Sequence, residues 1–139
     1  MTLRLAFILL LISTSAMAEG TSRGHGGGGW YKDFNPIVQQ YNQSGELFRI
    51  EGRCQSACTL FLGIRNVCIE PSATLLFHAG HDQRRIKTEL ATSRLMAAYN
   101  GRLQAYLTEH HAMDKVEVFY PISGRDMIHK FGYRPCPAR

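Results

Sequence analysis

Hydrophobic residues recur along this chain in short runs, and their spacing alternates between the helical and the extended period. Apolar side chains three and four positions apart predict a helix that Asn35 caps, with Pro36 in its first turn and Ser44-Gly45 at its end. Short apolar runs predict strands over residues 46–51, 74–77 and 116–120.

Three further apolar segments predict helices. The segment after Ser56 predicts a short buried helix, and residues 84–109 carry a single apolar stripe that predicts a long one. Ser123 and Asp126 form a capping box that starts a last short helix over residues 124–130. Because strands alternate with helices, we expect an α/β fold.

The first eighteen residues have the pattern of a secretory signal peptide. Arg4 is their only charge, Leu5–Ile12 is unbroken and apolar, and Ala16-Met17-Ala18 supplies small residues for cleavage after Ala18. The apolar run is too short to span a bilayer, and no other stretch reaches that length. We therefore expect a periplasmic or secreted protein with no stable membrane span.

Residues 19–33 form a glycine-rich segment between this signal and the domain expected over residues 34–139. The stretch from Glu19 to Gly29 lacks apolar periodicity, and its composition alone favours a flexible leader.

Four cysteines, Cys54, Cys58, Cys68 and Cys136, would be oxidised after export. We expect two disulfides, and the spacing does not choose among the three pairings. A metal site is the weaker alternative, because no second pair of ligands follows Cys54 and Cys58 at a suitable distance.

The number and distribution of charged residues argue against nucleic-acid binding and do not indicate a particular function. The 139 residues include 16 Lys and Arg and 11 Asp and Glu, a net charge of +5. The one tight basic group, Arg84, Arg85 and Lys87, lies beside Glu89 and predicts a solvated face, so we expect no nucleic-acid binding. No nucleotide-binding loop is present, His110-His111 suits a helix end better than a metal site, and we expect no cofactor.

Ser56 and His78 are the strongest candidates for chemistry. Ser56 follows a predicted strand, opens a helix and is flanked two positions away on both sides by small cysteines, as a crowded nucleophile turn requires. His78 ends the next predicted strand. Parallel strands joined by a helix share direction, so the two side chains should meet as nucleophile and base. A helix cap and a core histidine are the structural alternatives.

The segment from Arg49 to Gly80 resembles the active-site region of the Clp protease proteolytic subunit and its wider crotonase-like fold. It is most similar to small secreted bacterial relatives, whose motif reads C-x-S-A-C, then R, then P, then a strand ending in F-H. The resemblance implies a small βαβ core with a mainly parallel sheet and a long packing helix.

The resemblance also implies a role for particular residues. It makes Ser56 the nucleophile, His78 the general base and Ala57 the donor of one oxyanion N–H. A glycine of the turn over residues 26–29, Gly28 or Gly29, would donate the other. Glu117 lies nearest to the expected orienting carboxylate, with Asp114 behind it.

Two functions follow from these expectations. The first is a secreted serine hydrolase, a Clp-type peptidase acting on a peptide or another acyl substrate. The second is a non-catalytic binding or assembly module, favoured by the lack of a clear third carboxylate and of the strands that precede the glycine turn in this family. The absence of those strands leaves one edge of the sheet open. An open edge can pair with another copy of the chain, so a homo-oligomer is possible.

Overall fold

The computed structural model describes residues 19–139, and the expected signal peptide, residues 1–18, lies outside the described residues. The described part is a mixed α/β structure of short strands and helices. In chain order the elements are β1 (Gly20–Thr21), α1 (Tyr31–Ser44), β2 (Phe48–Ile50), β3 (Arg53–Gln55), the 3₁₀-helix η1 (Ser56–Gly63), β4 (Val67–Ile69), β5 (Thr74–Phe77), α2 (Glu89–Ala97), α3 (Gly101–Glu109), β6 (Tyr120–Ser123) and α4 (Gly124–His129).

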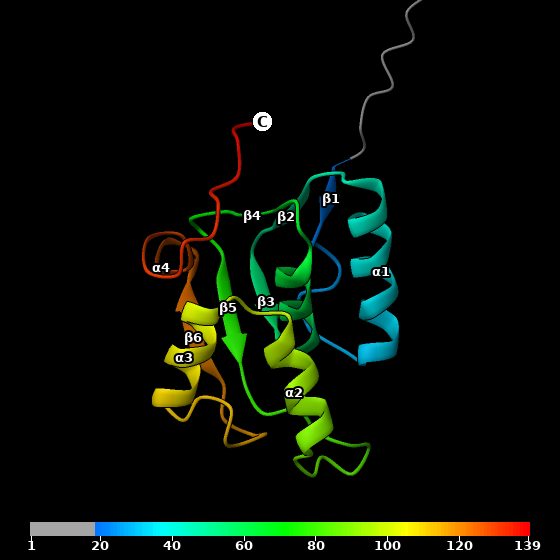
Figure 1. Ribbon diagram of the computed structural model, residues 1–139, viewed down its shortest axis with the longest axis vertical. Coiled ribbons are helices and arrows are strands. Elements are labelled where there is room, and N and C mark those ends of the chain that lie inside the picture. Colours follow the sequence, from blue (N-terminus) through cyan, green and yellow to red (C-terminus); the bar gives the residue numbers. More distant parts are fainter. Residues whose placement is uncertain (1–18) are drawn as a thin grey trace, which may run out of the picture.

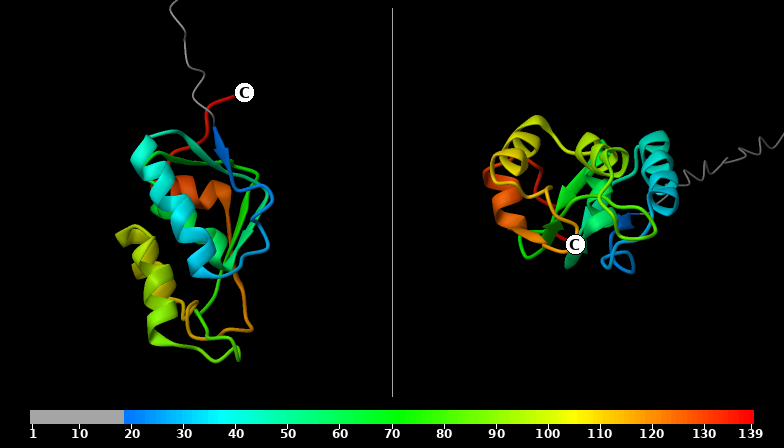
Figure 2. Two further views of the ribbon diagram at one scale, coloured as in Figure 1. Left: turned by 90° about the vertical axis from the view of Figure 1, so that its right-hand side faces the viewer. Right: turned by 90° about the horizontal axis from the view of Figure 1, so that it is seen from below.

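The strands form two small sheets. One has the order β1-β2-β4 and both of its ladders are parallel, while the other has the order β3-β5-β6, with β3 and β5 parallel and β6 antiparallel. Helices α1, α2 and α3 lie side by side on one face of these strands (Figures 1 and 2). No helix in residues 19–139 combines the length and the apolar character needed to cross a membrane.

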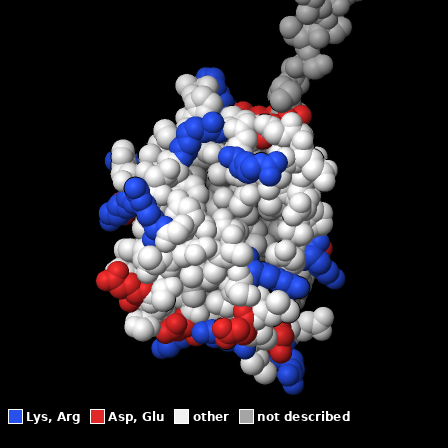
Figure 3. Space-filling model, in the orientation of Figure 1, with Lys and Arg blue, Asp and Glu red and all other residues white. Residues whose placement is uncertain are grey.

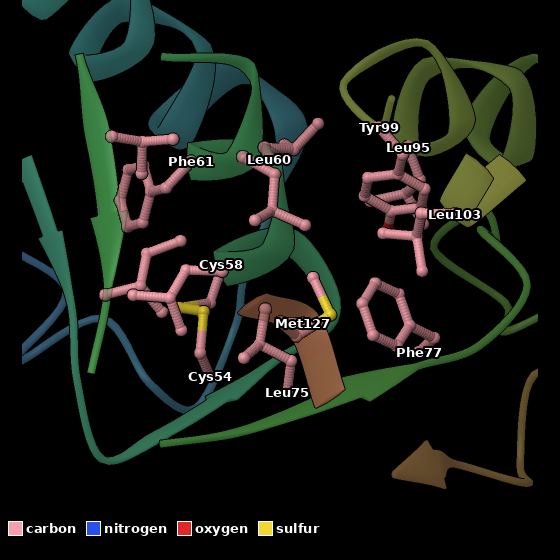
Figure 4. Packing of buried hydrophobic residues seen from close by; sticks show 14 of the residues in the cluster. Cys54, Cys58, Leu60, Phe61, Leu75, Phe77, Leu95, Tyr99, Leu103 and Met127 are labelled. Carbon is pink, nitrogen blue, oxygen red and sulfur yellow. A yellow bond between two sulfur atoms is a disulfide. The ribbon is translucent and has the colours of Figure 1, made fainter. Parts of the chain in front are cut away.

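The core lies between the strands and the helices. Its buried side chains come from most of the elements and surround the Cys54–Cys58 disulfide, as Figure 4 shows for Leu60, Phe61, Leu75 and Met127 among others. A second disulfide joins Cys68 in β4 to Cys136 near the C-terminus. These two bridges settle the pairing that the sequence left open.

A buried arginine fastens both ends of the described chain to the first sheet. Arg49 in β2 is only 2% exposed, and its guanidinium bonds to the carboxylates of Glu19 and Glu70 and donates to the Pro137 carbonyl at 2.9 Å. The beginning of β1 and the C-terminus accordingly lie at the same end of the molecule (Figure 1). Because β1 pairs with β2, the segment before α1 is part of the fold and not the flexible leader that its composition favours.

Several local predictions are confirmed. The strand over residues 74–77 is β5, and the Ser123 side chain caps α4 by accepting the Asp126 N–H. The helix expected after Ser56 is present as the 3₁₀-helix η1. The first long helix begins at Tyr31 instead of Asn35, because Phe34 is drawn into the core against Phe61 and adds a turn before Pro36.

The single long helix expected over residues 84–109 is wrong. The chain runs as a loop to Thr88 and then forms two helices, α2 and α3, separated at residues 98–100. Asn100 starts α3 by accepting the Leu103 N–H and also donates to the Phe131 carbonyl. The break turns Tyr99 inward, where it is buried. The Asn100 cap and the burial of Tyr99 therefore determine where the helix breaks, although the apolar stripe continues through this position.

The strand expected over residues 116–120 is also wrong. The strand β6 is displaced toward the C-terminus and contains Pro121, which is tolerated because β6 is at a sheet edge. Residues before it form a loop whose backbone meets the end of β5, where Ala79 donates to the Lys115 carbonyl at 3.0 Å. This loop before β6 becomes part of the candidate site.

Candidate active site

Ser56 is the first residue of η1, directly after β3, and its backbone is strained. Gln55 before it is extended, whereas Ser56 has a φ of 54°, in the left-handed region that residues other than glycine rarely adopt. Such strain costs free energy and persists only where the surrounding structure enforces it, often at functional sites. A serine at a strained strand-to-helix turn has the geometry of a nucleophile elbow.

His78 meets this serine at the shared end of two parallel strands. Strands β3 and β5 are neighbours, so Gln55 and Phe77 bring the residues that follow them to the same edge of the sheet. The His78 Nε2 lies 2.6 Å from the Ser56 Oγ. The contact between Ser56 and His78 that the sequence predicted is therefore present.

The second ring nitrogen of His78 determines which atom can act as a base. His78 Nδ1 lies 2.7 Å from the Val116 carbonyl oxygen. A carbonyl oxygen can only accept, so Nδ1 carries the proton and Nε2 is left with a lone pair facing the Ser56 hydroxyl. The Ser56 O–H then donates to Nε2, which is the arrangement that general-base catalysis needs.

Burial keeps this imidazole neutral. The His78 side chain is almost fully buried and its ring packs against Phe119. Burial lowers the pKa of His78 below its usual value, and the hydrogen bond to the Val116 carbonyl opposes this effect without cancelling it. The neutral form that can accept a proton is thus the main form at pH 7.

Glu117 does not orient His78 in this structure. Its carboxylate accepts two hydrogen bonds from Arg85, each of 3.0 Å, and Asp114 pairs instead with His111. The backbone of the loop approaches His78 one residue earlier, at Val116, so a carbonyl takes the position where a carboxylate was expected. The assignment of Glu117 came from its position in the family resemblance, and in the structure this position lies in the loop before β6.

The glycine-rich turn packs closely on the other side of Ser56. The Gly26 carbonyl accepts the Gln55 N–H at 3.0 Å, and the Gly27 carbonyl accepts the Gln55 side-chain amide at the same distance. Gly28 has a φ of 78°, and a Cβ there would come within 3.0 Å of the Ser56 Cβ. Only glycine allows this approach, so the turn is shaped to the elbow.

Two residues whose backbone N–H groups are candidate donors line the pocket beside the serine. Ala57 is in the first turn of η1, where N–H groups have no intrahelical acceptor, and Gly29 lines one pocket together with Ser56 and Ala57. Gly28 donates its own N–H to the His25 carbonyl at 3.0 Å, which removes it as a donor. Of the two glycines named from the sequence, only Gly29 therefore stays a candidate donor to an oxyanion.

Two buried hydroxyl groups, those of Thr59 and Tyr99, hold the backbone of the Ser56 turn in place. Thr59 donates to the Ser56 carbonyl at 2.7 Å and lies 2.6 Å from the Tyr99 hydroxyl, which donates to it in turn. Burial raises the pKa of Tyr99, so this hydroxyl stays protonated. Sequence inspection assigned Thr59 and Tyr99 to apolar helices and missed this support, although Asn100-Gly101 was a signal for the helix break that creates it.

Charges on the face of the molecule shown in Figure 3 are mixed in sign. The face shown in Figure 3 has basic side chains separated by uncharged ones, with acidic side chains interspersed along its lower edge. This distribution differs from the continuous basic stripe of nucleic-acid-binding surfaces. Within residues 19–139, no three His, Cys, Asp or Glu side chains gather as a metal-binding group.

No protein-family model, curated protein or solved structure matches this chain. The functional interpretation therefore depends on the geometry of the site.

Proposed function

We propose that this protein is a secreted serine hydrolase of the Clp type, with a small crotonase-like core. The observation that carries the proposal is the Ser56 Oγ to His78 Nε2 distance of 2.6 Å, with Nδ1 anchored on a carbonyl. A serine hydroxyl is a weak nucleophile unless an adjacent base removes its proton, and this pair supplies that base.

The reaction that fits these groups is acyl transfer through a covalent intermediate. As the Ser56 Oγ attacks the substrate carbonyl carbon, His78 Nε2 takes the hydroxyl proton, and the Ala57 and Gly29 N–H groups stabilise the negative oxygen. His78 then gives the proton to the leaving group as the bond to it breaks. A water molecule next attacks the acyl-serine ester, with His78 as base, and releases the acid and free Ser56.

The two disulfides support an exported protein. All four cysteines of the chain are paired within the described residues. Such bridges persist in oxidising compartments, so the proposed location is the periplasm or the extracellular space. Peptides or other acyl compounds are the proposed substrates, and assembly into a homo-oligomer stays a prediction.

A serine-directed fluorophosphonate probe tests the proposal. We expect stoichiometric labelling that peptide mass spectrometry places on Ser56. Labelling should disappear in Ser56→Ala and His78→Ala, and it should persist in Ser93→Ala, which removes an exposed hydroxyl on α2. Folded protein that stays unlabelled, or that is labelled equally in the Ser56→Ala variant, would refute the hydrolase.

A non-catalytic binding module is the second candidate, and one observation favours it. The position of the orienting carboxylate is held by the neutral Val116 carbonyl, so Ser56 and His78 could form a buried polar pair that only stabilises the turn. In that case the probe would not react with Ser56, and Ser56→Ala would change stability alone. The strained φ of 54° argues for the hydrolase, because a purely structural turn gains nothing from a serine held in this conformation.

A further inference from the structure

A small pocket opens directly beside Ser56. It has a volume of about 130 Å³, and its lining includes Ser56, Ala57 and Leu60 from η1 and Ala91, Arg94 and Leu95 from α2. A cavity of about 150 Å³ is known to hold a molecule the size of benzene. The pocket therefore accommodates one side chain of moderate size on an acyl group attached at Ser56.

The walls of this pocket are mostly apolar, with His81 and Ser56 as polar groups and Arg94 as the one permanent charge. Leu60 and Leu95 are buried, whereas Arg94 is exposed on α2. The Arg94 guanidinium lies over the Tyr31 ring, 4.6 Å from its centre. Stacking on an aromatic ring fixes the plane of a guanidinium and leaves its N–H donors directed outward.

This positive charge has no acidic partner within the described part of the chain. Within residues 19–139, no carboxylate oxygen lies within 4.0 Å of an Arg94 guanidinium nitrogen, and neither hollow that Arg94 lines contains an acidic residue. The second hollow adds Lys32 beside Tyr31. An arginine held in place beside an apolar pocket, without a carboxylate of its own, is suited to bind a carboxylate of a ligand.

We propose that the pocket selects an acyl group whose side chain has a short apolar stem and ends in a carboxylate, as in glutamate. The stem lies against Ala57, Leu60 and Leu95, and the carboxylate accepts hydrogen bonds from Arg94. This inference rests on the proposed hydrolase for its catalytic form, since Ser56 must hold the carbonyl to which the side chain is attached.

Matched activated esters measure this selectivity. The α-(4-nitrophenyl) esters of N-acetylglutamate and N-acetylglutamine differ only in the group that reaches Arg94, and the ester of N-acetylleucine supplies an apolar side chain of similar size. We expect kcat/KM to favour the glutamyl over the glutaminyl ester about tenfold or more, as a charge-assisted hydrogen bond allows. Arg94→Gln should bring this ratio close to one. Arg102→Gln removes an equal charge from the exposed face of α3 and should leave it unchanged.

A binding measurement separates failure of this proposal from failure of the hydrolase. In Ser56→Ala protein, N-acetylglutamate should bind more tightly than N-acetylglutamine, and Arg94→Gln should abolish the difference. A fluorophosphonate has no carboxylate for Arg94 to bind, so labelling of Ser56 reports on the hydrolase alone. The selectivity proposal is overturned if the leucyl ester is preferred or if Arg94→Gln keeps the glutamyl preference. It is also overturned if N-acetylglutamate and N-acetylglutamine bind the Ser56→Ala protein equally well.

Discussion

The Cys54–Cys58 disulfide closes a short loop around Ser56, and we predict that it controls reactivity more than stability. The bridge spans four positions and both cysteines are fully buried in the core (Figure 4). Ser56, between them, is held at a φ of 54°. Opening the bridge gives the turn freedom to relax toward an ordinary conformation, which would move the Oγ away from His78.

The loop lengths give the expected costs in stability. Loop-closure entropy assigns about 2 kcal/mol to a bridge with a separation of 4 residues and about 4 kcal/mol to one with a separation of 68 residues. The Cys68–Cys136 bridge should therefore stabilise the fold more. Relaxation of a left-handed residue gains about 1–2 kcal/mol, which lowers the population of the strained turn roughly five- to thirtyfold.

Two double variants compare these effects. Cys54→Ala/Cys58→Ala should lower the rate of fluorophosphonate labelling at least about fivefold and lower the free energy of unfolding by about 2 kcal/mol. Cys68→Ala/Cys136→Ala should cost about 4 kcal/mol and keep the native labelling rate. Urea denaturation measures the free energy of unfolding of each variant. The labelling rate is measured under conditions in which circular dichroism shows that both variants are folded. Equal labelling rates in the Cys54→Ala/Cys58→Ala variant and the native protein would refute the reasoning.

Four further outcomes follow from individual residues. Because burial lowers the pKa of His78, labelling should rise with pH around a midpoint below the usual 6.5 and stay constant above it; a pH profile of the labelling rate measures this. Gly28→Ala should lower the melting temperature and slow labelling, because its φ is 78° and a Cβ would lie 2.9 Å from a β3 carbonyl, while Gly27→Ala has open space and should do neither. Arg49→Met removes the buried partner of two carboxylates, of which Glu19 keeps only Arg139 at 3.9 Å, and should cost about 3 kcal/mol in urea denaturation. Glu117→Gln should slow labelling less than about fivefold, because its partner is an exposed arginine; a loss near 10⁴ would show that it orients the base after all.

The contact between Ser56 and His78 could be predicted from the sequence because it follows from local order alone. A strand, a helical turn and a second parallel strand bring the residues after both strands to one edge, whatever packs around them. Strand β5 and the Ser123 cap of α4 were predictable for a similar reason, since each depends on a few adjacent residues.

Features that depend on distant partners could not be predicted in this way. The break before α3 places Tyr99 against Thr59, which is forty positions away, and the apolar stripe carries no sign of that partner. The glycine-rich segment resembles a linker in composition, although β1 pairs with β2 and Gly26 binds Gln55. Val116 orients His78 through its backbone carbonyl, an atom that every residue has, so no side-chain pattern could identify it.

The carbonyl of Val116 also has a consequence for the chemistry. It accepts the Nδ1 proton and thereby fixes the tautomer, as a carboxylate would, but it carries no full charge to stabilise the imidazolium that forms when His78 takes the serine proton. Burial disfavours that charged ring further. In the proposed hydrolase this base would be weaker than in a complete triad, and less driving force would be available for proton transfer from Ser56. A site of this kind favours acyl compounds whose leaving group departs with little help, so esters and thioesters suit it better than peptide amides.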